Sequence, residues 1–274
     1  LNDHDQLRQD PLPAVLVGKQ DPTGEDRSRA RDQGKALAGK STLNRLELTP
    51  ARAHKKSRYK KITVQRRAVR DLFVDVFLQA HDSPPPCIIL DLDATDIPLH
   101  GQQAGRFFHG YYDEYCYLPL YIFCGEHLLC AKLRPSNIDA SAGALEELQR
   151  IIAAIREHWP TTLILIRGDS GFCREPIMAW CEQTGVYYLL GLAKNERLLR
   201  EIEEELARAK AQFDETGKSA RVFKDFRYST LDSWSRERRV VGKAESACGG
   251  EKGANPRFVV TSLPPEQREA KSLY

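Results

Sequence analysis

One stretch of sequence decides the fold: Cys87-Ile-Ile-Leu-Asp-Leu-Asp-Ala-Thr-Asp-Ile-Pro-Leu-His-Gly101. The mostly apolar run 88–92 predicts a buried strand, which Pro98 and Gly101 bring to an end. Carboxylates gather at the end of this strand: Asp91, Asp93 and Asp96. A carboxylate at the mouth of a buried strand is costly to desolvate unless a cation meets it. A divalent metal, a helix N-terminus or an arginine could be that partner.

A second predicted strand also ends in an aspartate. The apolar run 161–166 leads into Arg167-Gly-Asp-Ser-Gly171, so Asp169 lies at a strand end. If the two strands are neighbours, Asp169 would face Asp91 or Asp93 at one edge of a sheet. Two Mg²⁺ ions held there could activate an attacking oxygen and stabilise a leaving oxygen. In the structural alternative, Asp169 caps the next helix and Asp93 ends a strand in a turn.

Composition places the chain among ordinary globular proteins. Its 274 residues, 41% hydrophobic and 29% charged, suffice for one large domain or two smaller ones. No run approaches the roughly 18 apolar residues of a membrane span, and the polar N-terminus does not read as a signal peptide. The seven cysteines lack C-x-x-C spacing, so neither a zinc site nor a disulfide framework is predicted. The expected location is the reducing cytoplasm, in association with the nucleoid.

Charge is distributed unevenly along the chain. Residues 1–70 hold 17 Lys and Arg against 8 Asp and Glu, whereas the remainder holds 24 against 30. The segment 51–70 contains nine Lys or Arg and no acid, which favours contacts with a phosphate backbone over a merely solvated helix face. The candidate DNA contacts in this region are Arg58, Lys60, Lys61, Arg66 and Arg67.

A phosphate-loop pattern occurs near the N-terminus. Gly34, Gly39, Lys40 and Ser41 match it letter for letter. A working phosphate loop needs a buried strand immediately before it, and the polar residues 25–33 cannot form one. We therefore expect a polar loop that enters a helix, and a nucleotide hydrolase remains a distant alternative.

The proline run 83–86 breaks a helical segment and predicts a domain boundary. Strands are then predicted at 88–92, 117–124, 127–133, 161–166 and 186–192, with helices at 145–155 and 176–183. This order indicates an α/β fold with a ribonuclease-H-like mixed sheet flanked by helices. Asn195 is expected to cap a helix at 196–213, and segments 222–245 and 256–263 to form an added β-rich segment.

Four motifs carry a resemblance: LDLDATD-x-P-x-HG, FFHGYYDEYCYLPLYIF, LILIRGDSGFCR and YYLLGLAKN. They resemble bacterial insertion-sequence DDE transposases of the insertion-sequence 1380 type, which are related to the insertion-sequence 4 superfamily. The resemblance implies a homodimer that cleaves and transfers DNA strands at terminal inverted repeats with two Mg²⁺ ions. By motif match, Asp93 and Asp169 are the catalytic metal ligands, and Lys194 lies where it could reach DNA. Asp91 stays a second candidate that lies deeper on the strand.

The resemblance also divides the chain. It implies a basic, helical, DNA-contacting region at 1–82, a catalytic core at 87–194, and an insertion segment at 195–274. The family's third acid follows a Tyr-x2-Arg pattern, which none of the ten tyrosines begins. Glu266 and Glu269 follow two prolines and are expected in a loop. We therefore expect a fragment truncated at both ends and inactive alone, with a catalytically dead DNA-binding remnant as the alternative.

Overall fold

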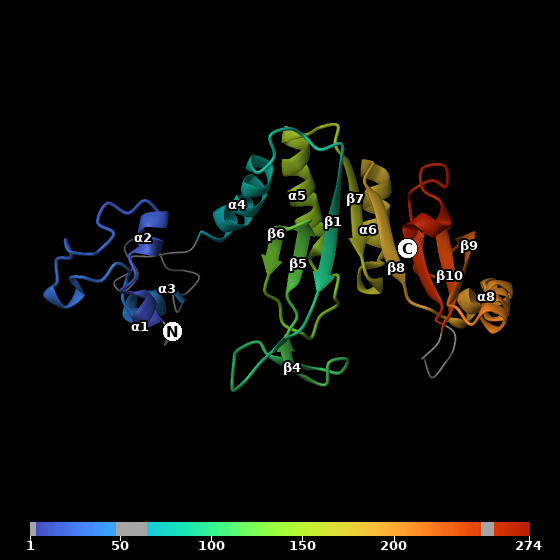
Figure 1. Ribbon diagram of the computed structural model, residues 1–274, viewed down its shortest axis with the longest axis horizontal. Coiled ribbons are helices and arrows are strands. Elements are labelled where there is room, and N and C mark those ends of the chain that lie inside the picture. Colours follow the sequence, from blue (N-terminus) through green and yellow to red (C-terminus); the bar gives the residue numbers. More distant parts are fainter. Residues whose placement is uncertain (1–3, 48–64, 248–254) are drawn as a thin grey trace. The chain divides into compact units, whose positions relative to one another are not determined.

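The computed structural model describes residues 4–47, 65–247 and 255–274, and the chain divides into two units. The first unit is Leu1–Val69 and the second is Arg70–Tyr274. Among the described residues, no helix is long and apolar enough to cross a membrane. Figure 1 labels the helices and strands of both units.

The first unit is built from short helices joined by polar loops. They are α1 (His4–Leu7), α2 (Leu12–Leu16), the 3-10 helix η1 (Ala30–Asp32) and α3 (Lys40–Glu47). Arg8 ties distant parts of this unit together, since its Nη2 lies 2.6 Å from Asp32 Oδ1 and its Nε donates to Leu37 O. The phosphate-loop pattern is a polar loop that enters α3, as predicted. No strand precedes it within the described residues of this unit.

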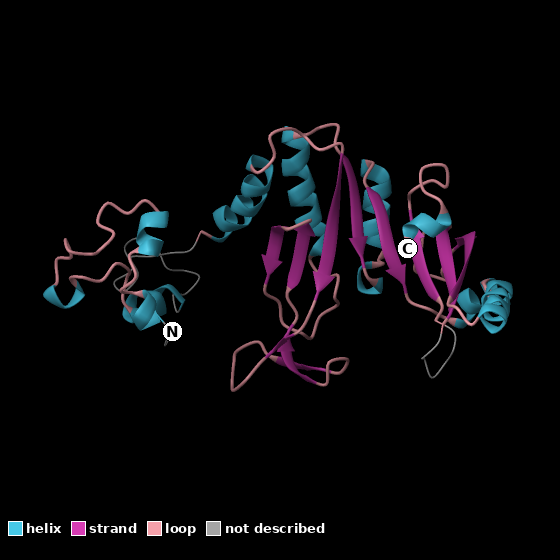
Figure 2. Cartoon of the chain, in the orientation of Figure 1, coloured by secondary structure: helices cyan, strands magenta, loops and turns pink. Residues whose placement is uncertain are grey.

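The second unit contains an eight-stranded mixed sheet with the order β6-β5-β1-β7-β8-β11-β10-β9 (Figure 2). The strands β1, β7 and β8 run parallel, and every other neighbouring pair is antiparallel. Their bounds are β1 Cys87–Ala94, β5 Leu120–Cys124, β6 His127–Lys132, β7 Leu163–Gly168, β8 Tyr187–Leu192, β9 Ala220–Tyr228, β10 Arg238–Ser246 and β11 Arg257–Thr261.

Helices cover one face of this sheet. In Figure 1, α5 (Ala144–His158) and α6 (Glu175–Thr184) lie on the same side of it, and α4 (Arg66–Gln79) adds Val74 and Phe77 to the same core. Side chains of β1 alternate: Leu90 and its even-numbered neighbours are buried against Leu148 and Ile151 of α5. The odd-numbered ones point to the other face, where Ile89 is 37% exposed. The predicted buried strand is therefore buried on one face only, because period-two alternation separates its aspartates from its core residues.

Two predicted elements prove to be divided. The run 117–124 is not one strand: Tyr117 ends β4 (Glu114–Tyr117) and Leu120 begins β5, because Pro119 between them has no N–H for a ladder hydrogen bond. The helix predicted at 196–213 is split at Ile202 into α7 (Glu196–Glu201) and α8 (Glu203–Thr216). Its predicted cap is confirmed, since Asn195 accepts a 3.0 Å hydrogen bond from Leu198 N.

The β-rich segment after α8 extends the main sheet. The region 222–245 is a hairpin, in which β9 and β10 pair antiparallel on either side of a loop at 229–237. The strand β11 then pairs with β8 from Leu189 to Leu192. The added strands therefore share one hydrogen-bond ladder with the strands that carry the predicted acids.

A second, three-stranded sheet was not predicted. Its order is β2 (Ile97–Pro98), β4, β3 (Phe107–His109), and it lies between β1 and β5 in the sequence. Strands of two to four residues are too short to show a clear alternation of apolar and polar residues. The loop before β3 turns at Gly101 and Gly105, which both have positive φ.

Candidate active site

The two predicted aspartates lie at one edge of the main sheet. Parallel pairing sets Asp91 opposite Arg167 and Leu92 opposite Gly168. Continuing this register by one residue places Asp93 of β1 opposite Asp169, just past the end of β7. Because adjacent strands are about 4.8 Å apart, the two residues are neighbours across the sheet. Both aspartates are exposed. The fold thus delivers two solvent-facing carboxylates to neighbouring strand ends.

The structure separates Asp91 from Asp93. Arg167 Nε and Nη2 bind the two carboxylate oxygens of Asp91 at 2.5 and 2.8 Å, a bidentate ion pair. For Asp93, no hydrogen bond or ion pair is found among the described residues. Asp91 already has its cation, whereas Asp93 is left available for another.

The loop after β7 fixes the backbone of Asp169. Its Oδ1 accepts a 2.8 Å hydrogen bond from Gly171 N and so caps the 3-10 helix η2 (Ser170–Phe172). On the neighbouring strand β8, a Cβ added at Gly191 would lie 2.9 Å from Ser170 N and 3.2 Å from Asp169 C. The alternative in which Asp169 caps a helix is therefore correct for its Oδ1 atom, which caps η2. Because Gly191 has no side chain, the loop that carries Asp169 packs directly on β8.

The turn segment after β6 supports the same loop. Arg134 is buried and donates to the carbonyls of Leu118, Ala140 and Ala142. Nearby, Asp139 Oδ2 binds Arg174 Nη2 at 2.8 Å, and Arg174 also donates to Ser170 O. These bonds tie the segment 134–142 to the backbone next to Asp169. Sequence reasoning missed them because most of the acceptors are backbone carbonyls, which any residue carries, and because Asp139 and Arg174 are 35 residues apart.

Other acids lie close to this edge. Burial raises the pKa of the Tyr112 phenol, and the charges of Asp96, Asp93 and Asp169 raise it further. A hydrogen bond with Asp96 raises the pKa of Glu114. Even so, the described residues contain no group of three or more His, Cys, Asp or Glu that could hold a metal ion. From the part of the chain that the structure describes, this edge brings together two candidate ligands, Asp93 and Asp169, and no third.

Comparison with known proteins gives a family. The model of "Transposase DDE domain group 1" matches residues 1–274. The chain belongs to this DDE transposase family. One similar solved structure is that of the piggyBac transposase synaptic complex with hairpin DNA, at 13% identity and a TM-score of 0.39. That match covers 73% of this chain and 39% of the other, so the chain spans about two fifths of that transposase's length. No curated protein matches the chain.

The candidate DNA contacts of this transposase domain fall into three groups. Lys194 is exposed just past the end of β8, the strand next to β7, so it lies at the same sheet edge as Asp169. Arg66 and Arg67 are exposed in the first turn of α4. Arg58, Lys60 and Lys61 lie outside the described residues.

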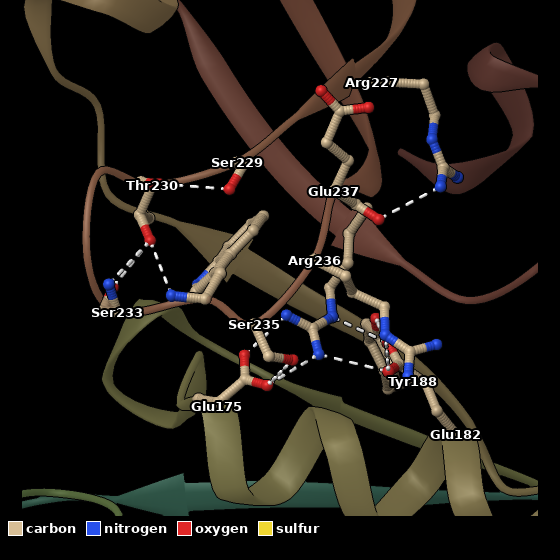
Figure 3. Close-up of polar contacts among 12 residues, drawn as sticks. Glu175, Glu182, Tyr188, Arg227, Ser229, Thr230, Ser233, Ser235, Arg236 and Glu237 are labelled. Carbon is tan, nitrogen blue, oxygen red and sulfur yellow. Dashed lines mark hydrogen bonds and ion pairs between the residues drawn. The ribbon is translucent and has the colours of Figure 1, made fainter.

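A buried arginine joins the added strands to the core of the transposase domain by binding Glu175 and Glu182. Both glutamates are labelled in Figure 3. Arg238, at the start of β10, is 2% exposed and binds two carboxylates of α6. Its Nη1 lies 2.6 Å from Glu175 Oε2, and its Nε lies 2.7 Å from Glu182 Oε1. Tyr188 of β8 donates to Glu182, and Ser235 donates to Glu175. Sequence reasoning missed this network because its members lie far apart in the chain.

Acid should weaken the transposase domain through these carboxylates. Burial is the largest single influence and raises the pKa values of Glu175 and Glu182. The hydrogen bonds and charge of Arg238, together with hydrogen bonds from Ser235 and Tyr188, outweigh it, and both pKa values lie below the ordinary 4.5. A carboxylate whose pKa is lowered by folding stabilises the folded state at pH values above its unfolded-state pKa. This stabilisation is lost as the pH falls through the folded-state pKa. Urea unfolding should therefore give a falling free energy of unfolding below about pH 4.5. Glu182→Gln should reduce this slope, and an unchanged slope would contradict the assignment.

Proposed function

We propose that this chain forms the catalytic core of an insertion-sequence DDE transposase, which cleaves and joins DNA at the element's inverted-repeat ends. The observation that carries the proposal is the β1–β7 register, which brings Asp93 and Asp169 to one exposed edge. The strand order β6-β5-β1-β7-β8, antiparallel for three strands and parallel for the last three, supports a ribonuclease-H-like core. Family membership supports the activity.

In this proposal Asp93 and Asp169 hold Mg²⁺, the metal typical of the family. Oxygen ligands suit this ion, which binds few protein carboxylates and fills its remaining positions with water and phosphate. Bound there, it would activate the attacking oxygen and stabilise the leaving one. Arg167 neutralises Asp91 beside the site, and the Lys194 ammonium would bind a DNA phosphate. A third carboxylate, from outside the described residues, and a second protomer complete the proposed enzyme.

Mn²⁺ binding tests the proposal, with the fraction of free ion measured by electron paramagnetic resonance. Asp93→Asn and Asp169→Asn should each weaken binding at least tenfold, because each removes one of two charged ligands. Asp91→Asn is the matched control, since it neutralises a carboxylate two residues away that is already paired with Arg167. Its affinity should stay within about twofold. Equal losses in all three variants would show a diffuse electrostatic effect and contradict the site.

A DNA-binding remnant without chemistry is the second candidate function. The absence of a three-acid group among the described residues favours it for this chain by itself. Metal-dependent nicking of supercoiled DNA separates the two functions, because a remnant binds DNA but does not nick it with Mg²⁺ or Mn²⁺. The nucleotide-hydrolase alternative finds no support in the described residues, since no strand precedes the glycine-rich loop and Lys40 pairs with Asp5 at 2.5 Å.

A further inference from the structure

The small sheet β2-β4-β3 has one face rich in exposed apolar side chains. In the register of β3 and β4, Phe108 is directly opposite Tyr115, and their rings pack edge to face at 5.7 Å. Phe108 is 52% exposed and Tyr115 is 49% exposed. On β2, Ile97 pairs with Tyr117, which places it on the same face. Exposed aromatic clusters of this kind usually mark binding surfaces.

A cation lies on the same face. The Arg106 guanidinium sits 4.7 Å from the centroid of the Tyr115 ring and donates to two uncharged oxygens, Gly101 O and Gln102 Oε1. The structure gives it no carboxylate partner among the described residues. We call Ile97, Arg106, Phe108 and Tyr115 the stacking face. The acid of β4, Glu114, pairs with His109 and so points to the opposite face.

We propose that the stacking face binds unpaired DNA bases next to the candidate active site. The chemistry matches: flat rings present a surface on which bases of any sequence stack, and an unneutralised guanidinium attracts the phosphate backbone. The stacking face also lies near the candidate active site in the chain, because β2 begins three residues after the end of β1. In the turn after β3, the charges of Asp93 and Asp169 act on the Tyr112 phenol, so this turn lies close to both aspartates. The proposal rests on the proposed function, which brings a DNA strand to those aspartates.

Binding to a duplex with a single-stranded thymine overhang that carries 2-aminopurine tests the proposal. The experiment uses the full chain in EDTA at fixed salt. The double variant Phe108→Ser, Tyr115→Ser should bind the overhang about tenfold or more weakly and lose the 2-aminopurine quenching, as removal of one or two base stacks predicts. Its affinity for the blunt duplex should be unchanged. Phe108→Tyr, which keeps the ring, should retain the quenching.

Tyr111→Ser is the matched control, because Tyr111 is an aromatic side chain, 84% exposed, in the turn beside the stacking face. It should bind the overhang like the parent. Equal losses on blunt and overhang DNA, or no loss in the double variant, would overturn the proposal. A change of oligomeric state in the double variant, with its affinity for the overhang unchanged, would also overturn the proposal. It would show that the stacking face binds a second protein chain. Failure of the proposed function would instead show as Mn²⁺ binding that is insensitive to Asp93→Asn.

Discussion

Replacing Arg238 with leucine is expected to lower the free energy of unfolding by about 3–5 kcal/mol, the cost of removing one partner from a buried ion pair. The side chain is 2% exposed and bridges two glutamates of α6 that are themselves mostly covered. Without the guanidinium, the Glu175 and Glu182 carboxylates stay charged but lose most of their hydrogen-bond donors, and their burial keeps water from replacing those donors. Urea denaturation, followed by tryptophan fluorescence, measures the loss.

Two further variants make this prediction specific. Arg236→Leu removes a cation that lies 3.6 Å from the same Glu182 but is 65% exposed, so it should cost no more than about 1 kcal/mol. Combining Arg238→Leu with Glu175→Gln and Glu182→Gln should recover part of the loss, because the two uncompensated charges disappear together. An Arg238→Leu variant as stable as the parent would show that the network contributes nothing to the fold.

Replacing Gly191 with alanine is expected to weaken Mn²⁺ binding as strongly as Asp169→Asn, at least tenfold, although every carboxylate remains. The new Cβ would lie 2.9 Å from Ser170 N and 3.2 Å from Asp169 C. Both are backbone atoms, so the loop that carries Asp169 must move away from β8. The overpacking itself should lower the free energy of unfolding by about 1–3 kcal/mol.

Gly110→Ala is the matched control for this variant. Gly110 lies in the turn after β3, has no positive φ, and a Cβ added there would meet nothing within 4 Å. Its metal affinity and stability should equal those of the parent. If Gly191→Ala lost stability but kept its Mn²⁺ affinity, the position of Asp169 would not depend on β8.

Much of the core could be predicted from the sequence because its signals are local. The sequence predicts β1 and β7 from mostly apolar runs that lead to Asp93 and Asp169. It also predicts the start of α7 from the capping residue Asn195. The partner of Asp91 could not be found, because Arg167 meets it only through parallel pairing of strands 76 residues apart. The same holds for Arg238, whose two partners lie on a helix about 60 residues away. The small sheet was missed because its strands are too short to show periodicity.

The pairing of β11 with β8 also bears on cooperativity. Adjacent strands of a sheet tend to unfold together. When one strand detaches, the backbone N–H and C=O groups of its neighbour lose their hydrogen-bond partners. Within the hydrogen-bond ladder of the main sheet, the hairpin β9–β10 is joined to the aspartate-bearing strands through β11 and β8. Local opening of β11 would therefore expose the edge of β8 at Gly191, behind the Asp169 loop. Through this coupling, the order of the candidate active site depends on strands that carry neither Asp93 nor Asp169.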